Sequence, residues 1–194
     1  IRDCLLSRGL GDVYKRQTAH FADLGYPLMA AVSRKSFIGA MSAESAPAMR
    51  DRASALCAAF MAGQGARILR VHNVAATREM LRDSHRAIIA LGSNMGNSCG
   101  HLDDALASLR LNPDVWVGAV SEYVTSEPAY LEAQAPFVNA VALIQTTFTP
   151  YELLHMLQSL EAEHGRVRSV ENGPRPLDLD IIDYEGVVCA DEQL

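Results

Sequence analysis

The chain has 194 residues, of which 49% are hydrophobic and 21% charged, an ordinary globular composition with room for one domain and part of another. Its formal net charge is −6, and no apolar run approaches the length of a membrane span. The four cysteines show neither CxxC nor zinc-site spacing, so we expect reduced thiols in a cytoplasmic protein.

The charge is divided unevenly along the chain. Residues 1–85 contain 12 Lys and Arg against 7 Asp and Glu, whereas residues 86–194 contain 5 against 16 and no lysine. An acidic second half without a basic stripe argues against a nucleic-acid partner. The opposite signs predict two domains, at 18–85 and 86–194. Residues 1–17 fit the pattern of neither half, and we expect them to be non-native.

The first half reads as alternating strands and helices. An apolar strand over 27–33 is followed by a polar loop, and 49–65 place apolar side chains at helical spacing. The expected buried face is Ala53, Leu56, Cys57, Phe60 and Met61. A second apolar strand over 66–73 and a short helix around 77–82 complete a βαβα order, typical of a parallel sheet or barrel.

The second half begins with a strand over 87–93 and then a helix. The apolar stripe of that helix is Leu102, Ala105, Leu106 and Leu109. Two strands follow in succession, 115–123 and 137–146, and we expect them to be antiparallel neighbours across the 124–136 loop.

The last helix of the chain has a recognisable start signal. Thr149 is the expected N-cap, Pro150 the first helical residue, and Glu152 completes a capping box. The expected buried face is Leu153, Leu154, Leu157 and Leu160. With a strand over 177–184 the order becomes βαββαβ, so we predict an α+β fold of the ferredoxin-like kind.

The densest cluster of charged residues lies between 165 and 182. If the segment from Leu177 is a strand, Asp178 and Asp180 project to one side with Cα atoms roughly 6.7 Å apart, a spacing suited to one or two magnesium ions. Three guanidinium groups could converge on a polyphosphate beside them; they belong to Arg166, Arg168 and Arg175. The alternative is that alternating acids are the solvent face of the strand, which is commoner for an isolated DxD.

Several motifs of residues 87–194 resemble the 6-hydroxymethyl-7,8-dihydropterin pyrophosphokinase family of folate biosynthesis. They are LGSNMGN at 91–97, SEYVTSEPAY at 121–130, PFVNAV at 136–141, LEAEHGRVR at 160–168 and GPRPLDLDI at 173–181. The resemblance implies transfer of the β,γ-pyrophosphoryl group of ATP to the hydroxymethyl oxygen of the reduced pterin, with release of AMP. It also implies that a further stretch after Leu194 brings a His-Tyr pair and a second aromatic residue over the pterin.

The same resemblance implies roles for individual residues. Asp178 and Asp180 would hold two magnesium ions. Phosphoryl transfer depends on positioning and charge neutralisation, so the catalytic group would be these two acids with Arg166 and Arg175. The nucleotide-binding set would be Gln158, Glu161, Arg166, Arg168 and Arg175. There is no P-loop motif, so the phosphates are not held in that way.

The resemblance places the pterin near Phe137 and Asn139, with the ring stacking on the bicycle and the amide pairing with its polar edge. Thr125 would lie in a loop that supplies backbone contacts. Two alternatives stay open: Phe137 could be a core residue, and Gly92, Ser93 and Asn94 could form a structural turn instead of contacting a ligand.

Residues 26–84 resemble the carboxyl end of dihydropteroate synthase, a TIM barrel, through SRKSFIG at 33–39 and RVHN at 70–73. The resemblance implies that Lys35 and Ser36 contact the pterin and p-aminobenzoate side and that Arg70 and His72 contact the diphosphate. His72 could instead be a core histidine. This family usually has Asp where Asn73 stands here.

The two activities are consecutive steps, so their fusion in one protein makes chemical sense. Two strands cannot close a barrel, so we expect no synthase activity from this segment. We also expect partial exposure of side chains that face absent strands: Leu28, Val32, Leu69 and Val71. The competing interpretations are a non-catalytic anion-binding module, an inactive fragment, and two unrelated pieces joined by accident.

Overall fold

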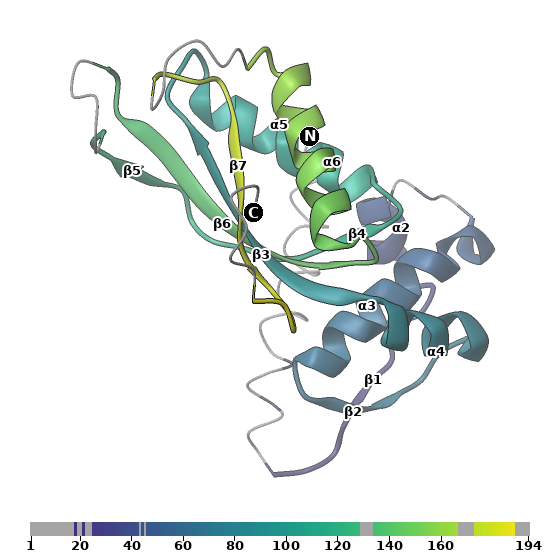
Figure 1. The fold of residues 1–194 in the computed structure, drawn as a ribbon. Coiled ribbons are helices and arrows are strands. Elements are labelled where there is room, and N and C mark those ends of the chain that lie inside the picture. The colour runs from purple at the N-terminus through teal and green to yellow at the C-terminus, as the bar shows by residue number, and fades with distance from the viewer. Residues whose placement is uncertain are drawn as a thin grey trace. The chain divides into compact units, whose positions relative to one another are not determined.

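The computed structural model describes residues 18, 21, 25–42, 44, 46–128, 134–166 and 173–188 (Figure 1). The chain divides into two compact units. The first comprises Ile1–Arg86, Arg110–Ala119 and Ile144–Thr147, and the second comprises Ala87–Leu109, Val120–Leu143 and Phe148–Leu194. None of the described helices has the length and hydropathy of a membrane-spanning segment.

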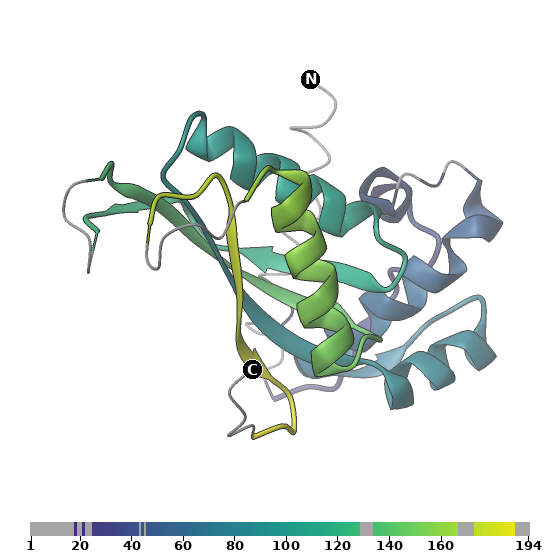
Figure 2. The same cartoon turned by 45° about the horizontal axis from the view of Figure 1, so that its top comes forward.

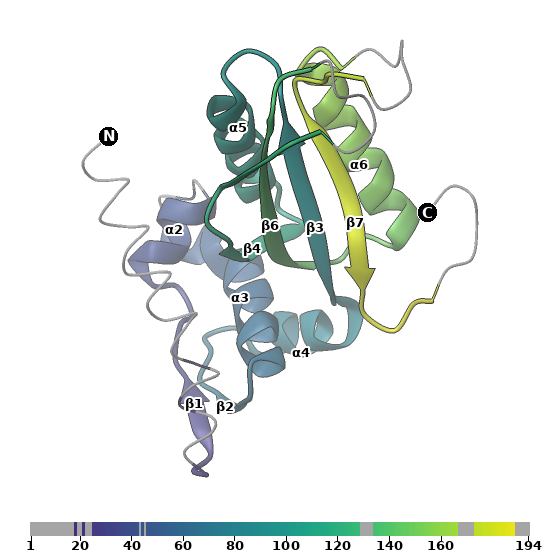
Figure 3. The ribbon, with the colours of Figure 1, turned by 90° about the vertical axis from the view of Figure 1, so that its left-hand side faces the viewer.

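The first unit begins with strands and helices in alternation. They are β1 (Leu28–Ala30), α2 (Ser36–Ser42), the 3₁₀ turn η1 (Pro47–Arg50), α3 (Asp51–Gly63), β2 (Ala66–Leu69) and α4 (Val74–Asp83). β1 and β2 pair in parallel, as expected for strands joined by a helical crossover (Figure 3). Residues 54–61 of α3 are all buried, because small side chains allow α3 to pack closely on its neighbours.

Three details of this unit differ from the sequence prediction. The expected polar loop after β1 contains the helix α2, and its Ile38 is fully buried. α4 starts earlier than expected, because the Asn73 side chain accepts a hydrogen bond from the Ala76 N–H at 3.0 Å and caps the helix. The predicted partial exposure is confirmed for Leu28, Leu69 and Val71, which are half-buried, and is wrong for Val32, which is buried.

The later elements form a five-stranded sheet and two helices. They are β3 (His85–Ser93), α5 (Ser98–Leu111), β4 (Val115–Val120), β5 (Val124–Ser126), β6 (Phe137–Thr146), α6 (Pro150–Glu163) and β7 (Asp178–Tyr184). The strand order is β4-β6-β3-β7, with β5 paired to β6. The 115–123 and 137–146 segments are therefore neighbours, as predicted. The short strand β5 was missed, because its three exposed residues carry no periodic signal.

Figure 2 shows α5 and α6 on the same face of the sheet. The predicted capping box of α6 is confirmed: the Thr149 N–H donates to Glu152 Oε2 at 2.8 Å, and the Thr149 hydroxyl accepts from the Glu152 N–H. The buried face of α6 is Leu153, Leu157, Leu160 and Glu161, with Leu154 half-buried. These leucines and the buried Leu177 and Leu179 supply core on the helix side, which leaves the opposite sheet face for polar side chains.

Candidate functional site

The two acids of β7 share one face of the sheet. Leu179 between them is 3% exposed, whereas Asp178 is half-buried and Asp180 exposed, as strand alternation requires. Asp178 lies opposite Gly92 of β3, and Asp180 lies opposite Ala90. Both acids line a hollow of about 350 Å³. The predicted geometry, two carboxylates on one side of a strand, is therefore present.

Two arginines clamp Asp178. Arg166 Nη1 lies 2.5 Å from Asp178 Oδ1, and Arg175 Nη2 lies 2.9 Å from Oδ2. Arg166 also pairs with Glu161, so one guanidinium bridges two carboxylates. The structure thus brings together two of the three predicted arginines with one predicted metal ligand. Arg168 lies outside the described residues.

Glu161 connects α6 to β7 from the buried side. Glu161 is only 3% exposed, and its Oε1 accepts a hydrogen bond from the Leu179 N–H at 2.7 Å. Burial raises the pKa of Glu161 above its ordinary value, although the Leu179 N–H and the charge of Arg166 oppose the shift. Glu161 therefore positions the strand beside Asp178 as well as pairing with Arg166. No local pattern could have revealed the first contact, because it depends on packing between two elements.

Asn94 joins three segments around the site. Its amide donates to Gln134 Oε1 at 2.9 Å and to the Ala135 carbonyl at 3.1 Å. Its Oδ1 accepts from the Arg175 N–H at 2.8 Å, and its own N–H donates to the Arg175 carbonyl at 3.1 Å. The amide is thus occupied by protein groups, which favours the structural interpretation for Asn94 over direct ligand contact.

Glycine at position 92 keeps the hollow open. A Cβ built there would lie 3.2 Å from Asn139 Oδ1 and 3.7 Å from the Cβ of Asp178. The contact to Asn139 is tighter than ordinary van der Waals contact, so a larger residue would push the amide aside. The neighbouring Ser93 hydroxyl is buried and has no hydrogen-bond partner among the described residues.

Phe137 and Asn139 follow each other on one face of β6. Both are half-buried, so Phe137 is not a core residue. The Arg175 guanidinium carbon lies 5.4 Å from the Phe137 ring centroid, within the range of a cation–π contact. Asn139 Nδ2 donates to Ser126 Oγ at 2.8 Å, and Asn139 lines the hollow with the two acids. An aromatic face and an amide thus lie beside the charged cluster.

Two further predicted residues are less tightly connected. Thr125 is exposed on β5, opposite Val138 of β6. Gln158 is half-buried on α6, and among the described residues no hydrogen bond joins it to the arginines or acids.

The donor set fits magnesium that arrives with a phosphate ligand. Within the described ranges, no three His, Cys, Asp or Glu side chains gather as a metal cage. Magnesium commonly takes one or two carboxylates and fills its other positions with water and substrate phosphates. Asp178 and Asp180 at one hollow satisfy that requirement, whereas they could not form a closed four-ligand site.

In the first unit, Lys35 and Ser36 line a hollow of about 550 Å³ together with Leu28, Val32 and Phe37. Arg70 and His72 are exposed and do not line it, so the structure does not bring the four predicted synthase residues into one pocket. His72 is not a core histidine: it is exposed, and Nδ1 lies 3.1 Å from Ser33 Oγ.

A network in the same unit escaped the sequence prediction. Arg34 donates two hydrogen bonds to the Asp51 carboxylate, at 2.7 and 2.9 Å, and Asn73 Nδ2 donates a third at 3.1 Å. These bonds, that of Arg34 foremost, lower the pKa of Asp51. Asn73 is therefore explained: an Asp at this position would place a second carboxylate against Asp51.

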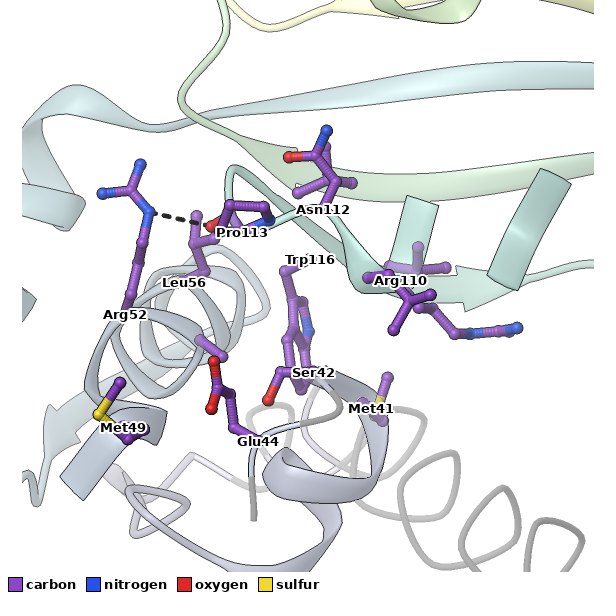
Figure 4. Close-up of a pocket in the computed structure, with 14 residues that line it drawn as sticks. Met41, Ser42, Glu44, Met49, Arg52, Leu56, Arg110, Asn112, Pro113 and Trp116 are labelled. Atoms are coloured by element: carbon purple, nitrogen blue, oxygen red, sulfur yellow. Dashed lines mark hydrogen bonds between the residues drawn. The ribbon is translucent and has the colours of Figure 1, made fainter. Parts of the chain in front are cut away.

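A third hollow, of about 80 Å³, lies in the first unit between α2, α3 and the start of β4 (Figure 4). Arg52 donates to the Pro113 carbonyl at 3.0 Å at its rim. Trp116 is 3% exposed and packs edge-on against Phe37 with ring centroids 6.5 Å apart. The volume is too small for a nucleotide or a pterin.

Comparison with known families agrees with both resemblances. Residues 88–193 match the family described as 7,8-dihydro-6-hydroxymethylpterin-pyrophosphokinase, and residues 13–72 match that described as pterin binding enzyme. The chain is 42% identical over 108 residues to the 2-amino-4-hydroxy-6-hydroxymethyldihydropteridine pyrophosphokinase of Bacillus subtilis, covering 56% of this chain and 65% of the relative.

Two other relatives are informative. The protein of the same name from Methylorubrum extorquens is 39% identical over 109 residues, covering 56% of this chain and 69% of the relative. The mitochondrial folate synthesis bifunctional protein of Arabidopsis thaliana is 34% identical over 118 residues, covering 61% of this chain but only 21% of the relative. The chain thus spans about two thirds of the single-function relatives and about a fifth of the bifunctional one. Since the family match covers more than half of the residues, this chain belongs to the 7,8-dihydro-6-hydroxymethylpterin-pyrophosphokinase family.

Proposed function

We propose that residues 86–194 transfer the β,γ-pyrophosphoryl group of ATP to the hydroxymethyl oxygen of 6-hydroxymethyl-7,8-dihydropterin and release AMP. One observation carries the proposal: Arg166, Arg175 and Asp178 form a single charged cluster beside the hollow that Asp180 and Asn139 line. The family membership and the relatives' names support the same reaction.

The chemistry needs positioning and neutralisation of charge. The hydroxymethyl oxygen attacks the β-phosphorus, the bond from that phosphorus to the bridging oxygen of the α-phosphate breaks, and the hydroxyl proton leaves to solvent. Arg166 and Arg175 would hold phosphate oxygens through their planar forks. Asp178 and Asp180 would hold two magnesium ions, whose chemistry there is neutralisation of the phosphate charge.

The pterin would stack on the aromatic face of Phe137. Asn139 would pair with its donor and acceptor edge, in a hollow that Gly92 keeps open. The backbone of β5 around Thr125, which lies in a strand and not in the expected loop, would supply further contacts. Gln158, Glu161 and Arg168 complete the proposed nucleotide side, with Glu161 acting through Arg166 and Leu179.

We assign this half of the chain to the ferredoxin-like α+β folds. The βαββαβ order, with β5 as an addition, the strand order β4-β6-β3-β7 and the two helices on one face support the assignment. We assign residues 18–85 to the end of a TIM barrel, supported by the parallel pairing of β1 and β2.

That first segment would belong to the enzyme that condenses the pterin pyrophosphate with p-aminobenzoate, with Lys35, Ser36, Arg70 and His72 on its substrate side. Two strands cannot enclose a barrel core, so we expect no condensation by this segment itself.

The test is formation of AMP from ATP and the reduced pterin with magnesium. Asp180→Asn should abolish it, whereas Asp183→Asn, an exposed acid on the same strand outside the hollow, should leave it unchanged. Nucleotide binding that is indifferent to magnesium, with no AMP formed, would instead identify a non-catalytic anion-binding module.

A further inference from the structure

We propose that Asp178 makes the nucleotide site selective for metal-bound ATP, because its carboxylate occupies the two guanidinium groups to which a phosphate would bind. This inference rests on the proposed function and adds to it a specificity role for Asp178 that is separate from metal binding.

The Asp178 carboxylate lies between two guanidinium groups, in the position that a phosphate would occupy if it bound to both arginines. Both Asp178 oxygens are engaged, Oδ1 by Arg166 at 2.5 Å and Oδ2 by Arg175 at 2.9 Å. Guanidinium forks bind carboxylate and phosphate oxygens with the same planar geometry. The three side chains are only 14–26% exposed, so water screens these contacts weakly. A phosphate must therefore compete directly with Asp178.

The arginines cannot easily turn away from the cluster. The main chain of Arg175 is held by two hydrogen bonds to Asn94, at 2.8 and 3.1 Å, and its guanidinium lies over the Phe137 ring. Arg166 is held by the buried Glu161. The Nε of Arg175 is buried without a hydrogen-bond partner among the described residues, so this fork has a donor left for a further acceptor.

The charges then couple the metal to the nucleotide. A phosphate that binds without metal would displace the Asp178 carboxylate from the arginines. The carboxylate and the phosphate, both negatively charged, would then face each other. Metal without phosphate would bring a dication against two guanidinium groups. When both bind, the metal neutralises Asp178 and the phosphates neutralise the arginines. The two ligands should therefore strengthen each other's binding reciprocally, within the range of about 5–150-fold that is usual for such coupling.

The test measures the dissociation constant of ATP in excess EDTA by calorimetry. Asp178→Asn removes the carboxylate charge that engages both guanidinium groups, so it should bind metal-free ATP at least about 5-fold more tightly than the unsubstituted chain, at the low end of that coupling range. Asp180→Asn removes the same charge from the same hollow but keeps the Asp178 contacts, so its affinity should change less than about 2-fold. Magnesium should improve ATP binding strongly in the unchanged chain and little in Asp178→Asn.

An unchanged or weaker affinity of Asp178→Asn for metal-free ATP overturns the inference, and so does an equal gain in Asp180→Asn. If the thermal transition shows that Asp178→Asn does not fold, the unsubstituted chain provides the test. Magnesium and ATP should each bind more tightly in the presence of the other, after correction for their complex in solution. If neither affinity increases, the coupling is refuted. AMP formation by the unchanged chain is a separate readout. If AMP forms but Asp178→Asn does not bind metal-free ATP more tightly, only this inference is refuted. If Asp178→Asn binds metal-free ATP more tightly but no AMP forms, only the transfer reaction is refuted.

Discussion

Replacing Glu161 separates its positioning role from its charge. Glu161→Ala would leave the Leu179 N–H without its acceptor in a buried position, and an unsatisfied buried donor costs about 1–3 kcal/mol. The lost volume of a side chain in a residue only 3% exposed adds to this, so we expect a total loss of about 2–4 kcal/mol in the free energy of unfolding. Glu161→Gln keeps a carbonyl oxygen for Leu179, and its loss should stay below about 1.5 kcal/mol.

The same residue gives a pH dependence of defined sign. Burial raises the pKa of Glu161 above its ordinary 4.5, so the folded protein holds this proton more firmly than the unfolded chain. The stability that results is fully present below the unfolded pKa and is lost as pH rises through the folded pKa. Glutamine cannot titrate. The unfolding free energy of the unchanged chain, relative to Glu161→Gln, should therefore fall as pH rises above about 4.5.

The measurement is urea-induced unfolding, followed by circular dichroism, at a series of pH values for the unchanged chain and both variants. Glu163→Gln on the exposed side of the same helix is the matched control and should show no such change. The total fall in the unfolding free energy of the unsubstituted chain relative to Glu161→Gln, divided by about 1.4 kcal/mol, gives the difference between the folded and unfolded pKa of Glu161. Equal losses in Glu161→Ala and Glu161→Gln, or a difference that does not vary with pH, would refute the reasoning.

Three further substitutions test other contacts. Asn139→Ala should weaken pterin binding at least about 10-fold, since the polar edge of the pterin would lose its partner and an unpaired polar group costs about 1–3 kcal/mol. ATP binding should stay within about 2-fold. Calorimetry measures both affinities, and an equal loss for both ligands would contradict the assignment. Asn73→Ala removes the helix cap that accepts a hydrogen bond from the Ala76 N–H, so thermal unfolding should show a loss of about 0.5–2 kcal/mol in stability. Asn73→Asp restores the cap but lacks the amide that donates to Asp51, so it should not recover the stability fully. Tyr184→Phe removes a 2.5 Å hydrogen bond to the Phe148 carbonyl and should lower stability by about 0.5–1.5 kcal/mol in urea unfolding; no change would mean that water replaces the phenol.

Local patterns anticipated the features that depend on neighbouring residues. The i, i+2 spacing of Asp178 and Asp180 was enough to place both on one face of the strand, because strand geometry alternates side chains whatever the surroundings. The Thr149 capping box was readable for the same reason, since all of its partners lie within one turn. The strands over 87–93 and 137–146 were also predicted closely, because each carries a strong apolar run.

Short or weakly periodic segments were missed. Helix α2 is seven residues long and β5 is three, too short for a repeating pattern to emerge. The burial of Val32 could not be inferred either, since it depends on which segment happens to lie over it.

The sequence by itself determined that this chain carries acids, guanidinium groups, an aromatic residue and an amide in the motifs that resemble the pyrophosphokinase family. Tertiary structure decided which of them meet: Arg166 and Arg175 reach the same carboxylate, Asn94 ties the Arg175 segment across 81 positions, and Glu161 reaches the Leu179 backbone. The physical reason is that side-chain periodicity acts over a few residues, whereas hydrogen bonds and ion pairs between distant segments depend on how sheets and helices pack.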